Sequence, residues 1–210
     1  MGGELAVLQM AEVSTRVASL LAQPHRLEIN VRHQPEPLIY FPDVELGVDK
    51  AFVTELKNGC RLSAVAGKLA SDTVHSSRCL RLVLEVKMPD DPRLNDSDYE
   101  QKIRLAGKIY SKLGIHFMVI EASNHFSKQE VARFRQISLD RHTGLDFRDF
   151  DLLRQFSRLF GRECSYGDLV ETLGGGPSGR AKVAAFQVRR YLSIDLEREI
   201  SDATRIVIGR

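Results

Sequence analysis

Cysteine is scarce in this sequence of 210 residues, and Cys60, Cys79 and Cys164 form no CxxC pair. This spacing supports neither a disulfide framework nor a zinc site, so we interpret the three as free thiols. Long apolar runs are also missing, because no stretch approaches the roughly 18 residues that a membrane span needs. Glu4 and Glu12 interrupt the N-terminal segment where a signal peptide would be apolar. We therefore expect a cytoplasmic protein without membrane contact.

An excess of charge of one sign is missing as well. Residues 1–127 carry 15 basic and 16 acidic side chains, residues 128–210 carry 15 and 12, and the net charge of the chain is +2. Balanced charge with 43% hydrophobic residues excludes intrinsic disorder, and the length allows one large domain or two small ones. Without a strong basic tract, counterion release contributes little to any binding of nucleic acid.

The first half of the chain shows alternating signals for helix and strand. Apolar residues three and four apart predict a helix from Glu4 to Leu21, before Pro24. Strict alternation predicts a strand over Arg26–Arg32, and strands are also predicted over Leu38–Leu46 and Cys79–Lys87. The order of these elements is typical of an α/β fold.

Three further segments complete this half. Residues 48–78 are interpreted as an insertion with helical patches. Ser97 followed by Glu100 predicts the start of a helix that runs to Leu113. The short apolar run Ile115–Ile120 predicts a buried strand.

In the last part of the chain, the sequence pattern predicts three consecutive helices followed by a hairpin. Helices are predicted over Asp149–Phe160, from Ser165 to Leu173 and from Pro177 to about Leu192. Short β-prone runs at Tyr191–Leu196 and Thr204–Ile208 predict a hairpin. We therefore divide the chain into a domain over 1–127, a linker over 128–144 and a winged-helix-like domain over 145–210.

Two of the predicted strands bear the residues of a candidate catalytic site. Asp43 follows Pro42 on one strand, and Glu85 and Lys87 end the next. Neighbouring strands bring both carboxylates together, and paired carboxylates hold a hard cation such as Mg²⁺, for which Mn²⁺ can substitute. The lysine ammonium can orient a water or offset the charge of a phosphorane. The plainer alternative is a surface carboxylate and a solvated charge pair.

The pattern Pro42-Asp43 followed by Glu85-Val86-Lys87 resembles the PD-(D/E)xK nuclease superfamily, and more closely the TnsA-type endonucleases of heteromeric transposases. The resemblance spans nearly the whole chain. It is carried by Gln23-Pro24, His25-Arg26-Leu27-Glu28-Ile29, Tyr40-Phe41-Pro42-Asp43-Val44, Leu82-Val83-Leu84-Glu85-Val86-Lys87, Asp168-Leu169, Asp195-Leu196 and Thr204-Arg205.

This resemblance implies a restriction-endonuclease-like mixed sheet flanked by helices, with a C-terminal winged-helix-like domain. It implies a Mg²⁺-dependent DNA endonuclease whose metal ligands are Asp43, Glu85 and a glutamate of the first helix that matches Glu4. Lys87 completes the implied catalytic set. The implied partners are double-stranded DNA, a transposase subunit and a regulatory ATPase. A stand-alone restriction-like or phage-encoded nuclease and a non-catalytic nucleoprotein adaptor remain alternatives.

Candidate DNA contacts lie on the last predicted helix. Arg180, Lys182, Arg189 and Arg190 are basic residues of a helix that a winged-helix domain uses for recognition. Solvated charge on a packed helix is the alternative. The preceding glycine-rich segment, residues 174–179, is interpreted as a turn, because no Lys followed by Ser or Thr completes a phosphate-binding loop.

Overall fold

The computed structural model of the chain describes residues 2–32, 34–70, 79–89 and 97–209. Its helices are α1 (Gly3–Val13), α2 (Lys50–Lys57), α3 (Leu62–Gly67), α4 (Ser97–Lys112), α5 (Ala122–His125), α6 (Lys128–Leu139), α7 (Phe147–Phe160), α8 (Tyr166–Thr172) and α9 (Gly176–Val188). Its strands are β1 (Val17–Ala22), β2 (Leu27–Ile29), β3 (Leu38–Tyr40), β4 (Val44–Val48), β5 (Leu80–Lys87), β6 (His116–Glu121), β7 (Glu163–Ser165), β8 (Leu192–Ile194) and β9 (Arg205–Ile208). None of the helices in these ranges is long and apolar enough to cross a bilayer.

A mixed sheet with the strand order β1-β4-β5-β6 organises the first half of the chain. β4 is antiparallel to both β1 and β5, whereas β6 runs parallel to β5 after the crossover through α4. Leu82, Leu84 and Val86 of β5 pack into the main core with α1, α2 and α3, and Val83 packs on the opposite face with Tyr110 of α4. The prediction of an α/β class with a mixed sheet flanked by helices is therefore confirmed.

The helix predicted from Glu4 to Leu21 is wrong in its second half. α1 ends at Val13, Ser14 takes an extended backbone conformation, and Val17–Ala22 forms β1 against β4. The reason lies in Arg16, which is buried and donates hydrogen bonds to the Asp49 carboxylate at 3.0 Å from both Nε and Nη2. These bonds fix the connection between helix and strand, which periodicity within one segment cannot indicate.

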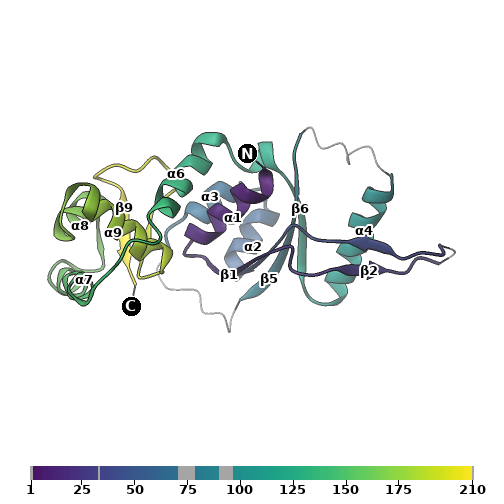
Figure 1. Ribbon diagram of the computed structural model, residues 1–210, viewed down its shortest axis with the longest axis horizontal. Helices are drawn as coiled ribbons and strands as arrows, with labels where there is room; N and C mark the ends of the chain where they lie inside the picture. The colour runs from purple at the N-terminus through teal and green to yellow at the C-terminus, as the bar shows by residue number, and fades with distance from the viewer. Residues whose placement is uncertain (1, 33, 71–78, 90–96, 210) are drawn as a thin grey trace.

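The predicted strand over Leu38–Leu46 is two strands. β3 and β4 are separated by Phe41, Pro42 and Asp43, because proline has no backbone N–H to continue a ladder. β3 pairs instead with β2, and this two-stranded ribbon packs beside α4 at one end of the molecule (Figure 1).

Two segments that we interpreted as an insertion and a linker contribute to the main core. In the first, α2 and α3 bury Phe52, Leu56 and Val65, while residues 71–78 lie outside the described ranges. In the second, α6 begins with a capping box between Ser127 and Glu130 and buries an apolar face against α1. Ser127 and Glu130 were thus a capping signal within the segment that we interpreted as a linker.

The C-terminal part has the order α7, β7, α8, α9, β8, β9, with an antiparallel sheet in the order β7-β9-β8. The three helices and the final hairpin agree with the predicted elements, and β7 is an addition. This part shares one core with the rest of the chain. The buried side chain of Gln187 on α9 donates to the carbonyl of Val13, the last residue of α1, at 2.8 Å.

Candidate active site

The register of β4 and β5 brings two acidic residues of the candidate site together. Val44 pairs with Leu84, so the next position outward along this antiparallel pair sets Asp43 opposite Glu85 on one face. Asp43 is 6% exposed and Glu85 is 1% exposed. The Asp43 Oδ2 atom also accepts a hydrogen bond of 2.7 Å from the backbone N–H of Val86. The site is therefore assembled by backbone pairing.

Glu85 is held by two tyrosines that the sequence analysis did not assign to the site. The hydroxyl of Tyr40, at the end of β3, donates to Glu85 Oε2 at 2.6 Å, and the hydroxyl of Tyr99 on α4 donates to Oε1. Burial and the charge of Glu85 raise the pKa of Tyr40, so its hydroxyl remains a donor. The two donors fix the plane of the Glu85 carboxylate.

Asp43 has an unusual protonation equilibrium. Burial raises its pKa to about 7, the charges of Glu85 and Glu4 act in the same direction, and the hydrogen bond from Val86 opposes them. Glu4, which is half-buried in the first turn of α1, lies close enough for its charge to act on the Asp43 carboxyl. The neighbouring acidic charges thus favour the protonated form of Asp43 in addition to the effect of burial.

Lys87 lies two residues beyond Glu85 and on the same face of β5. Its Nζ atom is 5.2 Å from the centre of the Tyr99 ring, a distance at which an ammonium is attracted to an aromatic face. Tyr99 therefore contacts both Glu85 and Lys87. The four residues that we predicted for catalysis, Glu4, Asp43, Glu85 and Lys87, converge at one end of β5.

The donor set fits a hard divalent cation by its chemistry. Within the described ranges, no group of three or more His, Cys, Asp and Glu side chains already stands at metal-binding spacing. Asp43, Glu85 and Glu4 nevertheless supply carboxylate oxygens, which Mg²⁺ prefers. Burial and the charges of Glu85 and Glu4 raise the pKa of Asp43, and a bound cation would oppose this by stabilising the deprotonated carboxylate.

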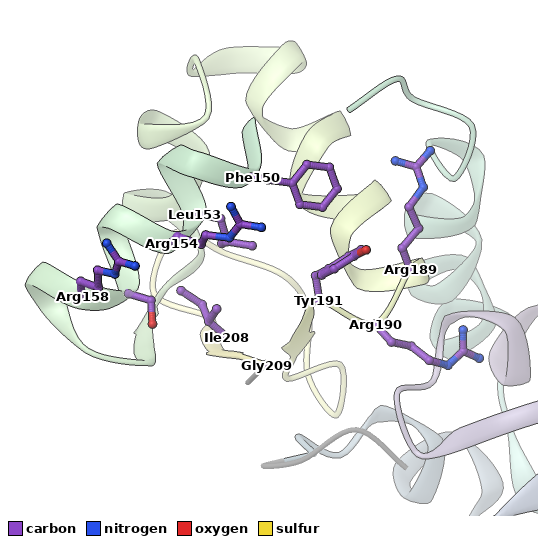
Figure 2. Close-up of a pocket in the computed structure, with 10 residues that line it drawn as sticks. Phe150, Leu153, Arg154, Arg158, Arg189, Arg190, Tyr191, Ile208 and Gly209 are labelled. Atoms are coloured by element: carbon purple, nitrogen blue, oxygen red, sulfur yellow. The ribbon is translucent and has the colours of Figure 1, made fainter. Parts of the chain in front are cut away.

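α9 ends at Val188 and not at about Leu192 as predicted, so Arg189 and Arg190 lie just beyond it. The predicted DNA contacts do not form one open surface. Arg180 is exposed, but Lys182 is paired with the buried Asp149 at 2.7 Å. Arg190 donates from Nε and Nη2 to the carbonyl of Val17, and burial lowers its pKa. Arg189 is exposed and is directed away from Arg190 (Figure 2).

α9 cannot offer one long face because both of its sides are packed. Residues 183–187 are all buried, since α9 lies against α8 on one side and against α1 and α6 on the other. The uninterrupted apolar run Val183-Ala184-Ala185-Phe186 was the available signal for this burial.

Comparison with known proteins yields no relative from which a role can be transferred. No protein-family model matches the chain, and a search of curated proteins finds no match. The features that bear on function are therefore the four converging residues, their two tyrosine partners and the strand register that sets Asp43 opposite Glu85.

Proposed function

We propose that the chain is a Mg²⁺-dependent DNA endonuclease with a PD-(D/E)xK-type core, acting as the TnsA-like subunit of a heteromeric transposase. The observation that carries the proposal is the position of Asp43 opposite Glu85, with Lys87 two residues farther along the same strand. The order α1, β1, β4, β5, α4, β6 also agrees with the helix and strands expected of such a core.

Each residue has a distinct part in this proposal. Asp43, Glu85 and Glu4 would hold Mg²⁺, which when bound supplies Lewis acidity and a water of lowered pKa. The Lys87 ammonium acts as a point charge that stabilises negative charge developing on the phosphate. Tyr40 and Tyr99 keep the Glu85 carboxylate in one orientation by donating to both of its oxygens.

The C-terminal part supports the heteromeric assignment. Three helices with a small antiparallel sheet are compatible with a winged-helix-like module. The first 127 residues carry a net charge of about −1, which limits how many phosphates they can neutralise alone. We propose that a transposase subunit and a regulatory ATPase supply the missing affinity and targeting.

A cleavage assay tests the proposal. Asp43→Asn, Glu85→Gln and Lys87→Ala should each abolish Mg²⁺-dependent cutting of linear DNA while the protein stays folded. Glu28→Gln is the matched control, because Glu28 is an exposed acid of β2 whose ion-pair partner is Arg26 and not a residue of the candidate site. Folded variants that cut as fast as the control would disprove the assignment of the site.

One observation favours the adaptor as a second candidate. Both oxygens of Glu85 already accept hydrogen bonds, an arrangement that also suits a purely structural carboxylate. Binding of Mn²⁺, followed by electron paramagnetic resonance, separates the two candidates. A nuclease site binds the ion and loses it in Asp43→Asn, whereas an adaptor has no specific site for Asp43→Asn to remove. Efficient cutting by the purified chain alone would instead favour the stand-alone nuclease.

A further inference from the structure

A groove of about 670 Å³ lies in the C-terminal part, outside the candidate active site. Arg154 and Arg158 extend from α7 on one side, and Tyr191 lies across from them just after α9 (Figure 2). Ile208, the last residue of β9, and Gly209 after it also contribute to the lining. Arg154 and Arg158 belong neither to the four proposed catalytic residues nor to the predicted DNA contacts, so no role has yet been given to them.

The groove is strongly cationic. Its lining includes four arginines and no acidic residue. Arg190 is committed to the carbonyl of Val17, and Arg189, although exposed, donates to the carbonyl of Thr143 at 2.9 Å. Arg158 is exposed. Arg154 forms an ion pair of 3.2 Å with Asp151, and both side chains are more than half exposed. Such surface pairs contribute little free energy, so an anionic ligand can compete for Arg154.

The groove also presents a fixed aromatic ring. Tyr191 is 46% exposed, and its ring centre lies 5.0 Å from that of Phe150 in an edge-to-face arrangement. Phe186, from the interior of α9, meets the same ring at 5.9 Å. Because two aromatic neighbours hold Tyr191, its orientation is set before any ligand arrives.

We infer that this groove binds a sugar–phosphate strand of DNA. All the cations that line it are arginines, whose planar guanidinium donates two parallel hydrogen bonds to a phosphate. Arg154 and Arg158 are one helical turn apart, about 6 Å along the axis, so they can contact separate phosphates. An exposed aromatic ring beside arginines suits a nucleotide strand better than an acidic peptide, because every base offers a face for stacking.

This inference rests on the proposed function only in taking DNA as the polymer, and its test requires no hydrolysis. Binding of fluorescent duplex and single-stranded DNA to the full chain would be measured in a chelator, from low to moderate salt. The double variant Arg154→Ala/Arg158→Ala should weaken duplex binding about 10-fold. It should also reduce the slope of log K against log salt by about 2, since each lost phosphate contact removes about 0.9.

The matched control is Arg148→Ala/Arg205→Ala, which removes the same charge from exposed arginines of the C-terminal part outside the groove. It should retain most of the affinity. Tyr191→Leu shows whether the bound strand is unpaired or part of a duplex. A larger loss of affinity for single-stranded than for duplex DNA identifies an unpaired strand, and equal losses of affinity identify the duplex backbone.

Two results would overturn the inference. One is equal affinity and salt slope for the groove variant and its control. The other is unchanged DNA binding with loss of polyglutamate binding, which would identify an acidic peptide as the ligand. Failure of the proposed function would appear separately, as a DNA-binding chain whose cutting does not depend on Asp43.

Discussion

The hydroxyl groups of Thr15 and Ser193 lie 2.8 Å apart in the protein interior, although 178 residues separate them along the chain. Ser193 also accepts a hydrogen bond from the backbone N–H of Ala70 at 2.9 Å. Residues from the start, the middle and the end of the chain thus meet at one buried point. The N-terminal sheet and the C-terminal helices consequently stabilise each other.

Gln187→Leu tests this mutual stabilisation. Gln187 is 1% exposed, donates to the carbonyl of Val13 and accepts from the N–H of Ile194 at 2.8 Å. Leucine leaves both backbone groups buried and unpaired, at a cost of about 3 kcal/mol. For a chain of this size we expect the midpoint of thermal unfolding to fall by about 6 to 12 °C. Gln155→Leu, at an exposed position, is the control, and an equal effect of both changes would contradict the prediction.

Stability should depend on pH through Asp43. Its pKa is raised to about 7 in the folded protein, above the value of about 3.9 in the unfolded chain, so the folded state binds more protons between these values. The contribution is complete below pH 4 and is lost as the pH rises through 7. In a chelator, the parent should therefore lose about 2 kcal/mol more than Asp43→Asn between pH 5 and pH 8.

The affinity for a metal ion should increase with pH, whereas the stability contributed by Asp43 decreases. A cation binds the deprotonated carboxylate, so the affinity for Mn²⁺ should increase as the pH rises from 6 to 8. Calorimetric titration at both pH values measures this change. An affinity that is independent of pH would show that Asp43 is not a ligand.

Removing the Tyr99 hydroxyl should impair the site without unfolding the protein. Tyr99→Phe retains the ring beside Lys87 but leaves Glu85 Oε1 without this donor, and we expect cutting or metal affinity to fall about 10-fold. Tyr110→Phe is the control, because that buried hydroxyl bonds to His25 at 2.7 Å and not to Glu85. Equal losses in both variants would indicate general destabilisation.

The basic residues on α9 and just after it should separate into two groups. Arg190→Ala removes the hydrogen bonds to the carbonyl of Val17 and should lower the thermal midpoint by several degrees. Arg180→Ala, at an exposed position, should leave the midpoint unchanged. Thermal melting with DNA binding on the same preparations checks this difference. Loss of DNA binding in Arg190→Ala at an unchanged midpoint would restore Arg190 as a direct contact.

Local patterns in the sequence predicted much of the fold. Alternation identified β5, the short apolar run identified β6, and Ser165 marked the start of α8. The Pro-Asp and Glu-x-Lys segments located the carboxylates of the candidate site, because strand pairing brings such positions together.

Long-range contacts explain what could not be predicted. The start of β1 depends on the hydrogen bond between Arg16 and Asp49. The fixed orientation of the Glu85 carboxylate depends on the hydroxyl of Tyr99, which lies on the crossover helix α4. Periodicity describes one segment at a time, so it cannot reveal that a helical pattern ends where a buried arginine finds its partner. The same limit applies to α9, whose basic residues were visible but whose packing on both sides was not.

α1 connects the candidate active site with the C-terminal part of the chain. Its first turn carries Glu4 beside Asp43, and its last residue, Val13, accepts the hydrogen bond from Gln187. Eleven helical residues span about 16 Å, and a helix resists compression along its axis. One continuous helix therefore contacts the candidate site at its first turn and the C-terminal part at its last residue.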